Sequence, residues 1–176
     1  MKWLIVKEDY LKFLRENGDS RIPLSSYGDE KFKPFFGSLF ETDDCYYVTQ
    51  VSHPQEKHYA LENGPDFKKV FLPNSDRLLA VVNLNYMFPI PKFMYQELRY
   101  QNIEKYKKFI ISENKSKYID LLKRELKIIN NMDMGHAARL VYQEKYNNPE
   151  SRLAQRCLNF KALEYLALRY KQTCFN

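Results

Sequence analysis

Residues 34–51 read PFFGSLFETDDCYYVTQV and contain two runs rich in aromatic and β-branched residues. The three residues between the runs, Thr42, Asp43 and Asp44, are typical of turns, so we expect this Asp pair to form a turn rather than a pair of catalytic carboxylates. The stretch predicts a β-hairpin. Its second strand ends at Val51, and the chain then places Ser52 and His53 at the strand exit.

The same kind of pattern predicts further strands on both sides of the hairpin. A short strand is expected over 1–6, and a helix from Asp9 to the stop signal Asn17-Gly18. The segment 54–67 is expected to be a long loop. Two strands are expected over 69–72 and 78–84, the second crossing the centre of the sheet because it is almost entirely apolar, and residues 87–91 are expected to stay extended.

Helical periodicity dominates after Pro91. Apolar residues between Leu98 and Ile110 and again between Tyr118 and Ile129 have helical spacing, and two further helices are expected over 134–146 and 159–170. An early antiparallel sheet followed by late helices makes the fold class α+β, with the helices concentrated in the C-terminal half. A length of 176 residues suits one domain, 1–176.

The three cysteines, Cys45, Cys157 and Cys174, are odd in number and widely separated. They form neither a disulfide framework nor the paired spacing of a zinc site. No signal peptide and no run of membrane-spanning length is present. These observations predict a soluble protein of the cytoplasm, without a membrane partner.

The positive charge lies in the second half of the chain. Residues 1–88 contain 11 Lys and Arg against 13 Asp and Glu, whereas residues 89–176 contain 17 against 9. Such asymmetry favours a polyanionic partner, because each neutralised phosphate releases condensed counterions. The alternative is that the late helices simply have lysine-rich solvated faces. The many aromatic residues can stack on bases or fill a core.

The stretch from Ser52 to His58 holds two of the three histidines, a hydroxyl and a lysine. RNA can be cut without a metal ion when a base takes the 2′-hydroxyl proton, an acid protonates the departing 5′-oxygen, and positive charge stabilises the phosphorane. Imidazole, hydroxyl and ammonium groups supply these functions. The alternative is an ordinary solvated loop. A zinc site would need a third ligand besides these two histidines, and His136, the only other histidine, has no Cys pair beside it. A serine nucleophile would be expected in a Gly-x-Ser-x-Gly elbow, and no such motif is present.

Several short motifs follow one another in an order that resembles a known family. They are Lys33-Pro34-Phe35-Phe36-Gly37, Tyr47, Ser52-His53-Pro54 with Lys57-His58, Val82-Asn83-Leu84, residues 87–91 (MFPIP), and the late Cys157-Leu158-Asn159-Phe160 with Leu163-Glu164 and Tyr170. Together they resemble the endoribonuclease toxins of type III toxin–antitoxin systems, the ToxN and AbiQ family. The similarity spans nearly the whole chain.

This resemblance implies a compact, strongly twisted, barrel-like antiparallel sheet surrounded by helices. It also implies metal-independent cleavage of transcripts, often A-rich ones, leaving 2′,3′-cyclic phosphate and 5′-hydroxyl ends. The implied partners are substrate mRNA and a folded antitoxin RNA cut from a repeat precursor, which inhibits the toxin and can assemble it into a protein–RNA oligomer. In the family the system serves abortive infection against phage. No cofactor and no metal site are implied.

The resemblance also nominates site residues. Lys33 and Ser52 match the family's active-site lysine and its catalytic Ser/Thr position. His53 departs from the pattern, where a second Ser/Thr is common, and Gln55 stands where a lysine is usual. His53, Lys57 and His58 are the further catalytic candidates, the last two as replacements for the lost positive charge. Candidate RNA contacts are Tyr27, Lys31, Tyr47, Gln55, Lys115, Lys117 and Lys123. Asn83 is interpreted as a structural hydrogen-bonding residue.

Two other classes of function fit the same sequence. A non-catalytic RNA-binding module would share the charge asymmetry and the aromatic residues but would need nothing from Ser52 to His58. A helical protein-interaction domain would show no salt-dependent affinity for RNA.

Overall fold

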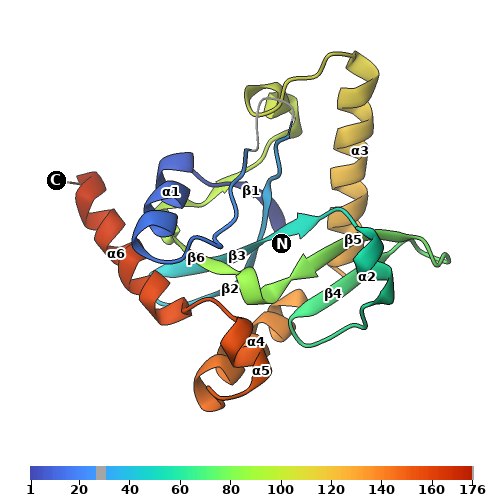
Figure 1. Ribbon diagram of the computed structural model, residues 1–176. Helices are drawn as coiled ribbons and strands as arrows, with labels where there is room; N and C mark the ends of the chain where they lie inside the picture. Colours follow the sequence, from blue (N-terminus) through green and yellow to red (C-terminus); the bar gives the residue numbers. More distant parts are fainter. Residues whose placement is uncertain (27–30, 176) are drawn as a thin grey trace.

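The computed structural model describes residues 1–26 and 31–175, the last three of them by their backbone alone. Tyr27, a candidate RNA contact, lies outside the described residues. Within them, an antiparallel sheet occupies the first half of the chain and most helices occupy the second (Figure 1). The α+β prediction is therefore confirmed.

The described residues form a seven-stranded sheet. Its strands are β1 (Lys2–Ile5), β2 (Phe35–Glu41), β3 (Cys45–Ser52), β4 (Phe67–Phe71), β5 (Leu78–Asn83), β6 (Phe88–Pro91) and β7 (Gln96–Glu97). The path runs β4-β5-β3-β2-β1-β7, while β6 pairs with β3 beside this path. Among the described residues the path ends at β4 and β7 without closing, so the twisted sheet is open and the barrel-like expectation was too strong.

The predicted hairpin is confirmed as β2 and β3, and it forms the middle of the sheet. Phe35 pairs with Gln50 and Phe36 with Thr49, and the Thr42 N–H donates to the Cys45 carbonyl across the turn. Because β3 also pairs with β5 and β6, it is the strand on which the sheet is organised. The prediction that residues 78–84 cross the centre was wrong: β5 lies between the outer strand β4 and β3, one place from the end of the path.

Six helices occur among the described residues: α1 (Glu8–Asn17), α2 (Glu56–Ala60), α3 (Ser112–Ile129), α4 (Met134–Asn147), α5 (Arg152–Arg156) and α6 (Phe160–Phe175). Short 3₁₀ turns cover η1 (Leu84–Tyr86), η2 (Lys92–Met94) and η3 (Tyr100–Lys105). The short helices α2 and α5 were not expected from the sequence. The helix expected between Leu98 and Ile110 was wrong, because this segment holds only η3 and Ile110 is 82% exposed.

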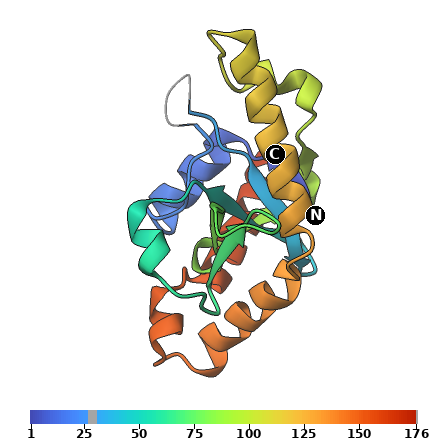
Figure 2. The same cartoon turned by 90° about the vertical axis from the view of Figure 1, so that its right-hand side faces the viewer.

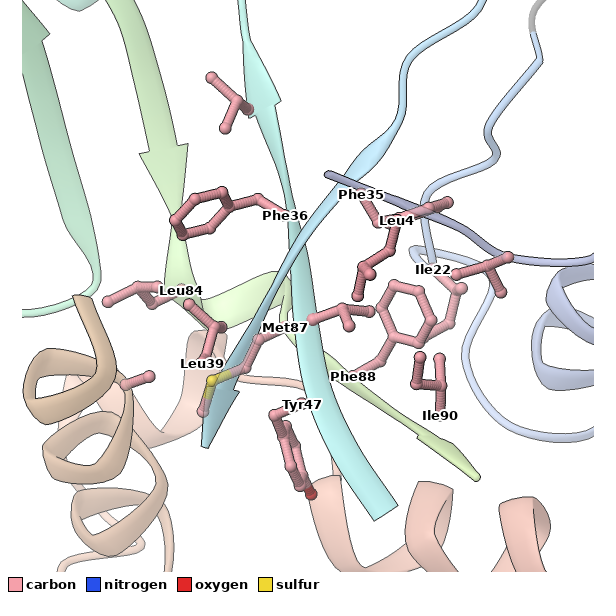
Figure 3. Packing of buried hydrophobic residues seen from close by; sticks show 14 of the residues in the cluster. Leu4, Ile22, Phe35, Phe36, Leu39, Tyr47, Leu84, Met87, Phe88 and Ile90 are labelled. Atoms are coloured by element: carbon pink, nitrogen blue, oxygen red, sulfur yellow. The ribbon is translucent and has the colours of Figure 1, made fainter. Parts of the chain in front are cut away.

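The sheet has a packed hydrophobic layer on each face. Successive side chains of a strand point to opposite faces, and Phe35 and Phe36 follow this rule: in Figure 3, Phe36 lies with Leu84 on one side of β2, while Phe35 lies with Ile90 on the other. All four are fully buried. A strand with large apolar residues at consecutive positions is typical of a sheet buried on both faces.

The helices cover the two faces and one end of this sheet. Helix α6 packs along β6 and against α1, and α4 packs on β2. Helix α3 stands on the side of the sheet opposite α6, with α4 and α5 at the end between them (Figures 1 and 2). Glu164 fastens α6 to the sheet, because it accepts hydrogen bonds from the Tyr47 and Tyr142 hydroxyls at 2.7 and 3.2 Å.

We expect Gly135→Ala to destabilise the fold by roughly 1–3 kcal/mol, the usual cost of overpacking. A Cβ at Gly135 would lie 2.7 Å from the Leu39 carbonyl oxygen, a backbone atom that cannot turn aside. Gly64→Ala is the matched control, since its Cβ would meet the Asp66 carboxylate at an ordinary 3.6 Å. Urea unfolding measures both variants, and equal losses would contradict this account of the α4–β2 contact.

Candidate active site

Lys33 is held at the entrance to β2 by its own backbone. Its N–H donates to the Ser25 carbonyl at 2.8 Å, and its carbonyl accepts a hydrogen bond from the Gln50 amide at 3.3 Å. The side chain is half-buried and lines two neighbouring hollows of the surface. A lysine so placed can present its charge to groups bound in either hollow.

The first hollow, which we call the aromatic cavity, has a volume of about 490 Å³. Its apolar walls come from β1, from the segment before β2, from the end of β3 and from α3: they are Trp3, Phe32, Pro34, Val51, Leu121 and Leu122, together with the Tyr118 ring. Its polar groups are Lys31, Lys33, His53, Lys107 and Glu125. The cavity therefore combines aromatic walls with cations, as sites for nucleotides do.

The second hollow, which we call the polar groove, has a volume of about 410 Å³ and is lined mainly by polar side chains. Arg15, Arg21 and Lys33 contribute positive charge, and Thr49, Gln50, Ser52 and Asn83 contribute hydrogen-bonding groups. Arg21 donates hydrogen bonds to the Asp19 carboxylate and to the Arg156 carbonyl, the latter at 3.1 Å, and these contacts fix its position. The hydrogen bonds from Arg21 hold the pKa of Asp19 below the usual range. The groove thus offers several fixed cations to an anionic backbone.

Ser52 and His53 face different hollows. Ser52 is the last residue of β3, pairs with Val81 and lines the polar groove, whereas His53 lines the aromatic cavity. The alternation of side chains along an extended chain separates them. Lys33 lines both hollows, so it shares the polar groove with Ser52 and the aromatic cavity with His53.

The imidazole of His53 is poised in its neutral form. Partial burial and, second, the nearby Lys33 ammonium lower its pKa from the ordinary value near 6.5. Both causes disfavour the positively charged ring. At pH 7 a neutral ring nitrogen of His53 can therefore accept a proton.

His58 has a structural role at the start of α2. Its ring Nδ1 accepts a hydrogen bond from the Gln55 N–H at 3.0 Å, and the ring packs against Phe67. Only 8% of His58 is exposed, and burial lowers its pKa, with Lys57 and Lys69 adding to the effect. This reciprocal capping was not visible in the sequence, where Gln55 and His58 looked like substrate contacts.

Lys57 and His58 lie apart from the other catalytic candidates. They line a third hollow together with the buried Asp66 and its ion-pair partner Arg156, at 2.9 Å. The stretch from Ser52 to His58 is thus divided: its first two residues join Lys33, and its later ones do not. The structure gives His58 the place of a helix cap rather than that of an acid or base beside Lys33.

The candidate RNA contacts have varied surroundings. Lys31 is exposed and lines the aromatic cavity, and Gln55 is exposed at the start of α2. Lys115 and Lys117 form surface ion pairs with Glu104 and Glu113, and the Lys123 ammonium lies 5.7 Å from the centre of the Tyr100 ring. All three of these lysines lie on α3, the helix that forms one wall of the cavity.

The prediction that Tyr47 contacts RNA was wrong, because its side chain is fully buried. The ring stacks on Phe40 with the ring centres 4.4 Å apart, and the hydroxyl is used by Glu164. Burial raises its pKa far above the usual value for tyrosine. Tyr47 is therefore a core residue that anchors α6.

Sequence reasoning missed Arg15, Arg21, Lys107 and Glu125 as members of the two hollows. Glu125 carried a detectable signal, since it stands between Leu122 and Ile129 on the buried stripe of α3. It is 4% exposed, and burial raises its pKa to about 7. The three basic residues carried no comparable signal, because isolated cations in polar segments are usually solvated.

Among the residues that the structure describes, no group of three or more His, Cys, Asp or Glu side chains is placed to hold a metal ion. None of the described helices is long and apolar enough to cross a membrane.

Three solved structures share the fold. A lactococcal anti-phage endoribonuclease, AbiQ, of a type III toxin–antitoxin system is 17% identical, covers 97% of this chain and 98% of its own, and has a TM-score of 0.76. A chain from a type III system in which a non-coding RNA pseudoknot selectively inhibits the toxin is 20% identical, with 97% of each chain covered and a TM-score of 0.77. A chain from a bacterial antiviral system regulated by a processed non-coding RNA is 19% identical, covers 94% and 96%, and has a TM-score of 0.74.

A comparison with curated protein sequences found no match. The sequence profile described as "Toxin ToxN, type III toxin-antitoxin system" matches residues 2–167, nearly the whole chain and all of the sheet. The resemblance read from the motifs around Lys33 and Ser52 is thereby confirmed. This chain belongs to the ToxN family of type III toxin–antitoxin toxins.

Proposed function

We propose that this protein is an endoribonuclease toxin that cuts transcripts in the cytoplasm by metal-independent transesterification. The observation that carries the proposal is the position of Lys33 between two hollows, with Ser52 in one and His53 in the other. An RNA strand lying across Lys33 would place one phosphodiester within reach of an ammonium, a hydroxyl and an imidazole. The endoribonuclease activity of the similar AbiQ supports the same reaction class.

Each group has a defined part in the proposed reaction. Neutral His53 accepts the proton of the 2′-hydroxyl as the bond from the 2′-oxygen to phosphorus forms. The Lys33 ammonium stabilises the negative charge that develops on the phosphorane oxygens. The bond from phosphorus to the 5′-oxygen then breaks, and the Ser52 hydroxyl relays a solvent proton to that oxygen. The products are a 2′,3′-cyclic phosphate and a 5′-hydroxyl, and no electron acceptor is needed.

We further propose that a folded, repeat-derived antitoxin RNA inhibits the enzyme and can link several copies into a protein–RNA oligomer. A similar toxin is inhibited by a non-coding RNA pseudoknot. In this chain the excess of 17 Lys and Arg over 9 Asp and Glu in residues 89–176 provides charge for such a polyanion. Lys115, Lys117 and Lys123 on α3 and Gln55 at the start of α2 remain candidate contacts. Lys57 is proposed to add charge at the third hollow rather than to take part in catalysis.

Incubation of the purified protein with a transcript in excess EDTA tests this function. Cleavage that yields cyclic phosphate and 5′-hydroxyl ends is the expected result. Tight, salt-sensitive binding that leaves the RNA intact would instead identify a non-catalytic RNA-binding module. Cleavage that stops in EDTA and returns with Mg²⁺ would overturn the metal-independent mechanism.

The pH dependence of cleavage follows from His53. Because its folded-state pKa is lowered, the neutral form persists below pH 6.5 and is lost only as the pH falls further through the lowered pKa. We expect the single-turnover rate to stay level down to about pH 6.5 and to decline below it. In His53→Ala the rate is low throughout and this decline is absent, whereas His136→Ala, changed at a histidine outside both hollows, keeps the wild-type profile. An unchanged profile in His53→Ala would exclude His53 as the base.

A further inference from the structure

Glu125 is a buried carboxyl that the proposed reaction does not use. It lines the aromatic cavity and is 4% exposed. Among the described residues it has neither a hydrogen-bonding partner nor an ion-pair partner, although its side-chain oxygens are not sealed from solvent. A buried polar group without a partner costs free energy unless something satisfies it. The cavity is the open space in which a ligand can do so.

The rest of the cavity fits a flat heterocycle. Its volume of about 490 Å³ falls in the range of small-molecule sites, ~300–1,000 Å³. Trp3 and Phe32 are almost fully buried in the cavity wall. The Tyr118 hydroxyl donates to the Phe32 carbonyl at 2.8 Å, which fixes the position of the Tyr118 ring. Aromatic side chains held in this way are the usual platforms for nucleobases.

The cavity also adjoins the proposed reaction centre. Lys33 and His53 are among its lining residues, and Lys31 and Lys107 add two further cations. A base held inside would thus leave its phosphate beside Lys33. We propose that the aromatic cavity binds one purine base of the RNA next to the phosphate that is cleaved, and that Glu125 determines which purine by hydrogen bonding to its edge.

The protonation state of Glu125 sets the choice of purine. As an acid, the carboxyl offers a donor beside an acceptor, which matches N1 and the amino group of adenine; as a carboxylate, it offers two acceptors, which match the N1–H and amino group of guanine. Burial raises the pKa of Glu125 to about 7, so the acid dominates at pH 6 and the carboxylate at pH 8. The adenine-to-guanine affinity ratio therefore falls as the pH rises.

Other charged or titratable groups face the same space. They are Lys31 and Lys33 before β2, His53 after β3, Lys107 after η3 and Tyr118 on α3. Burial raises the pKa of Tyr118, so its hydroxyl keeps its proton between pH 6 and 8. Burial and the nearby Lys33 lower the pKa of His53, and because histidine is the other group here that can change charge near neutral pH, the test includes a variant without it.

The test uses the wild-type protein and a probe that cannot be cleaved. The inference rests on the proposed function, which places the reaction centre beside this cavity. The measurement itself does not depend on cleavage, because the probes, 2′-deoxynucleoside 3′,5′-bisphosphates, lack the attacking hydroxyl. Trp3 is the only tryptophan of the chain and lies in the cavity wall, so its fluorescence reports binding there. Titration with the four bisphosphates at pH 6 and pH 8 gives their affinities.

We expect saturable quenching by the purine probes, and an adenine-to-guanine affinity ratio about tenfold higher at pH 6 than at pH 8. Glu125→Gln offers a donor and an acceptor at every pH, so it should prefer adenine at both. Glu113→Gln, an exposed change on the same helix, and His53→Gln should keep the wild-type trend. If Glu125→Gln fails to fold, as judged by circular dichroism, the wild-type and His53→Gln titrations decide.

No saturable quenching, the same ratio at pH 6 and 8 in the wild type, or a pH trend that persists in Glu125→Gln would each overturn the inference. A pH trend abolished by His53→Gln would overturn it as well, because the histidine would then be its source. Failure of the proposed function would look different: the probes would still bind with this preference while transcripts stayed intact in EDTA.

Discussion

Lys33→Ala is expected to lower the rate of RNA cleavage by about 10³-fold while leaving the protein folded. Removal of one preorganised group that stabilises developing charge typically costs ~10²–10³-fold, and the Lys33 ammonium is the cation that lines both hollows. The loss of a half-buried side chain at a strand entrance leaves the core intact. Single-turnover cleavage and arrest of growth on induction in cells both measure the effect.

Lys31→Ala is the matched control for Lys33→Ala. Lys31 is exposed, carries the same charge two residues earlier and lines the aromatic cavity but not the polar groove. We expect it to weaken RNA binding with little change in the single-turnover rate at saturating protein. Equal losses in the two variants would mean that bulk charge, rather than the position of Lys33, promotes cleavage.

Phe88→Ala is expected to destabilise the fold by ~3–5 kcal/mol, the usual cost of removing a buried phenylalanine. The Phe88 side chain is fully buried on β6, and its ring meets that of Phe35 edge-on with the centres 5.3 Å apart (Figure 3). For a chain of this length the melting temperature should fall by roughly 6–20 °C. Differential scanning calorimetry measures this shift.

Phe93→Ala provides the comparison for Phe88→Ala. Phe93 follows β6 closely in the chain but is 44% exposed, so its truncation should change the free energy of unfolding by roughly 0.5 kcal/mol or less. A comparable loss in both variants would contradict the description of the layer around Phe35 and Phe88 as the core of this face.

The sequence predicted the hairpin and the late helices because their signals are local. The aromatic and β-branched runs and the turn residues of 34–51 lie within one hairpin, and the periodic apolar residues of α3, α4 and α6 each lie within a single helix. The central position assigned to residues 78–84 was wrong because strand order depends on pairing between distant segments, here β3 with β5 and β6. A run of apolar residues does not itself indicate how far from the edge of a sheet its strand lies.

The sequence named Lys33, Ser52 and His53 as candidate site residues, and in the structure they line two hollows that share Lys33. The division of Ser52 and His53 between the hollows follows from the direction of each side chain at the exit of β3. His58 misled the prediction because its partner is a backbone group three residues away. Glu125 is distant in sequence from His53, and only the packing of α3 beside β1 and β3 places both in one cavity.

The position of Lys33 in the lining of both hollows also matters for inhibitor discovery. A small heterocyclic compound that fills the aromatic cavity would reach the Lys33 ammonium from the side of Trp3. It would not need to enter the polar groove, whose arginines suit a phosphate backbone. Such a compound needs little negative charge of its own, which favours passage through cell envelopes. It would block the proposed reaction centre from the side of the aromatic cavity alone.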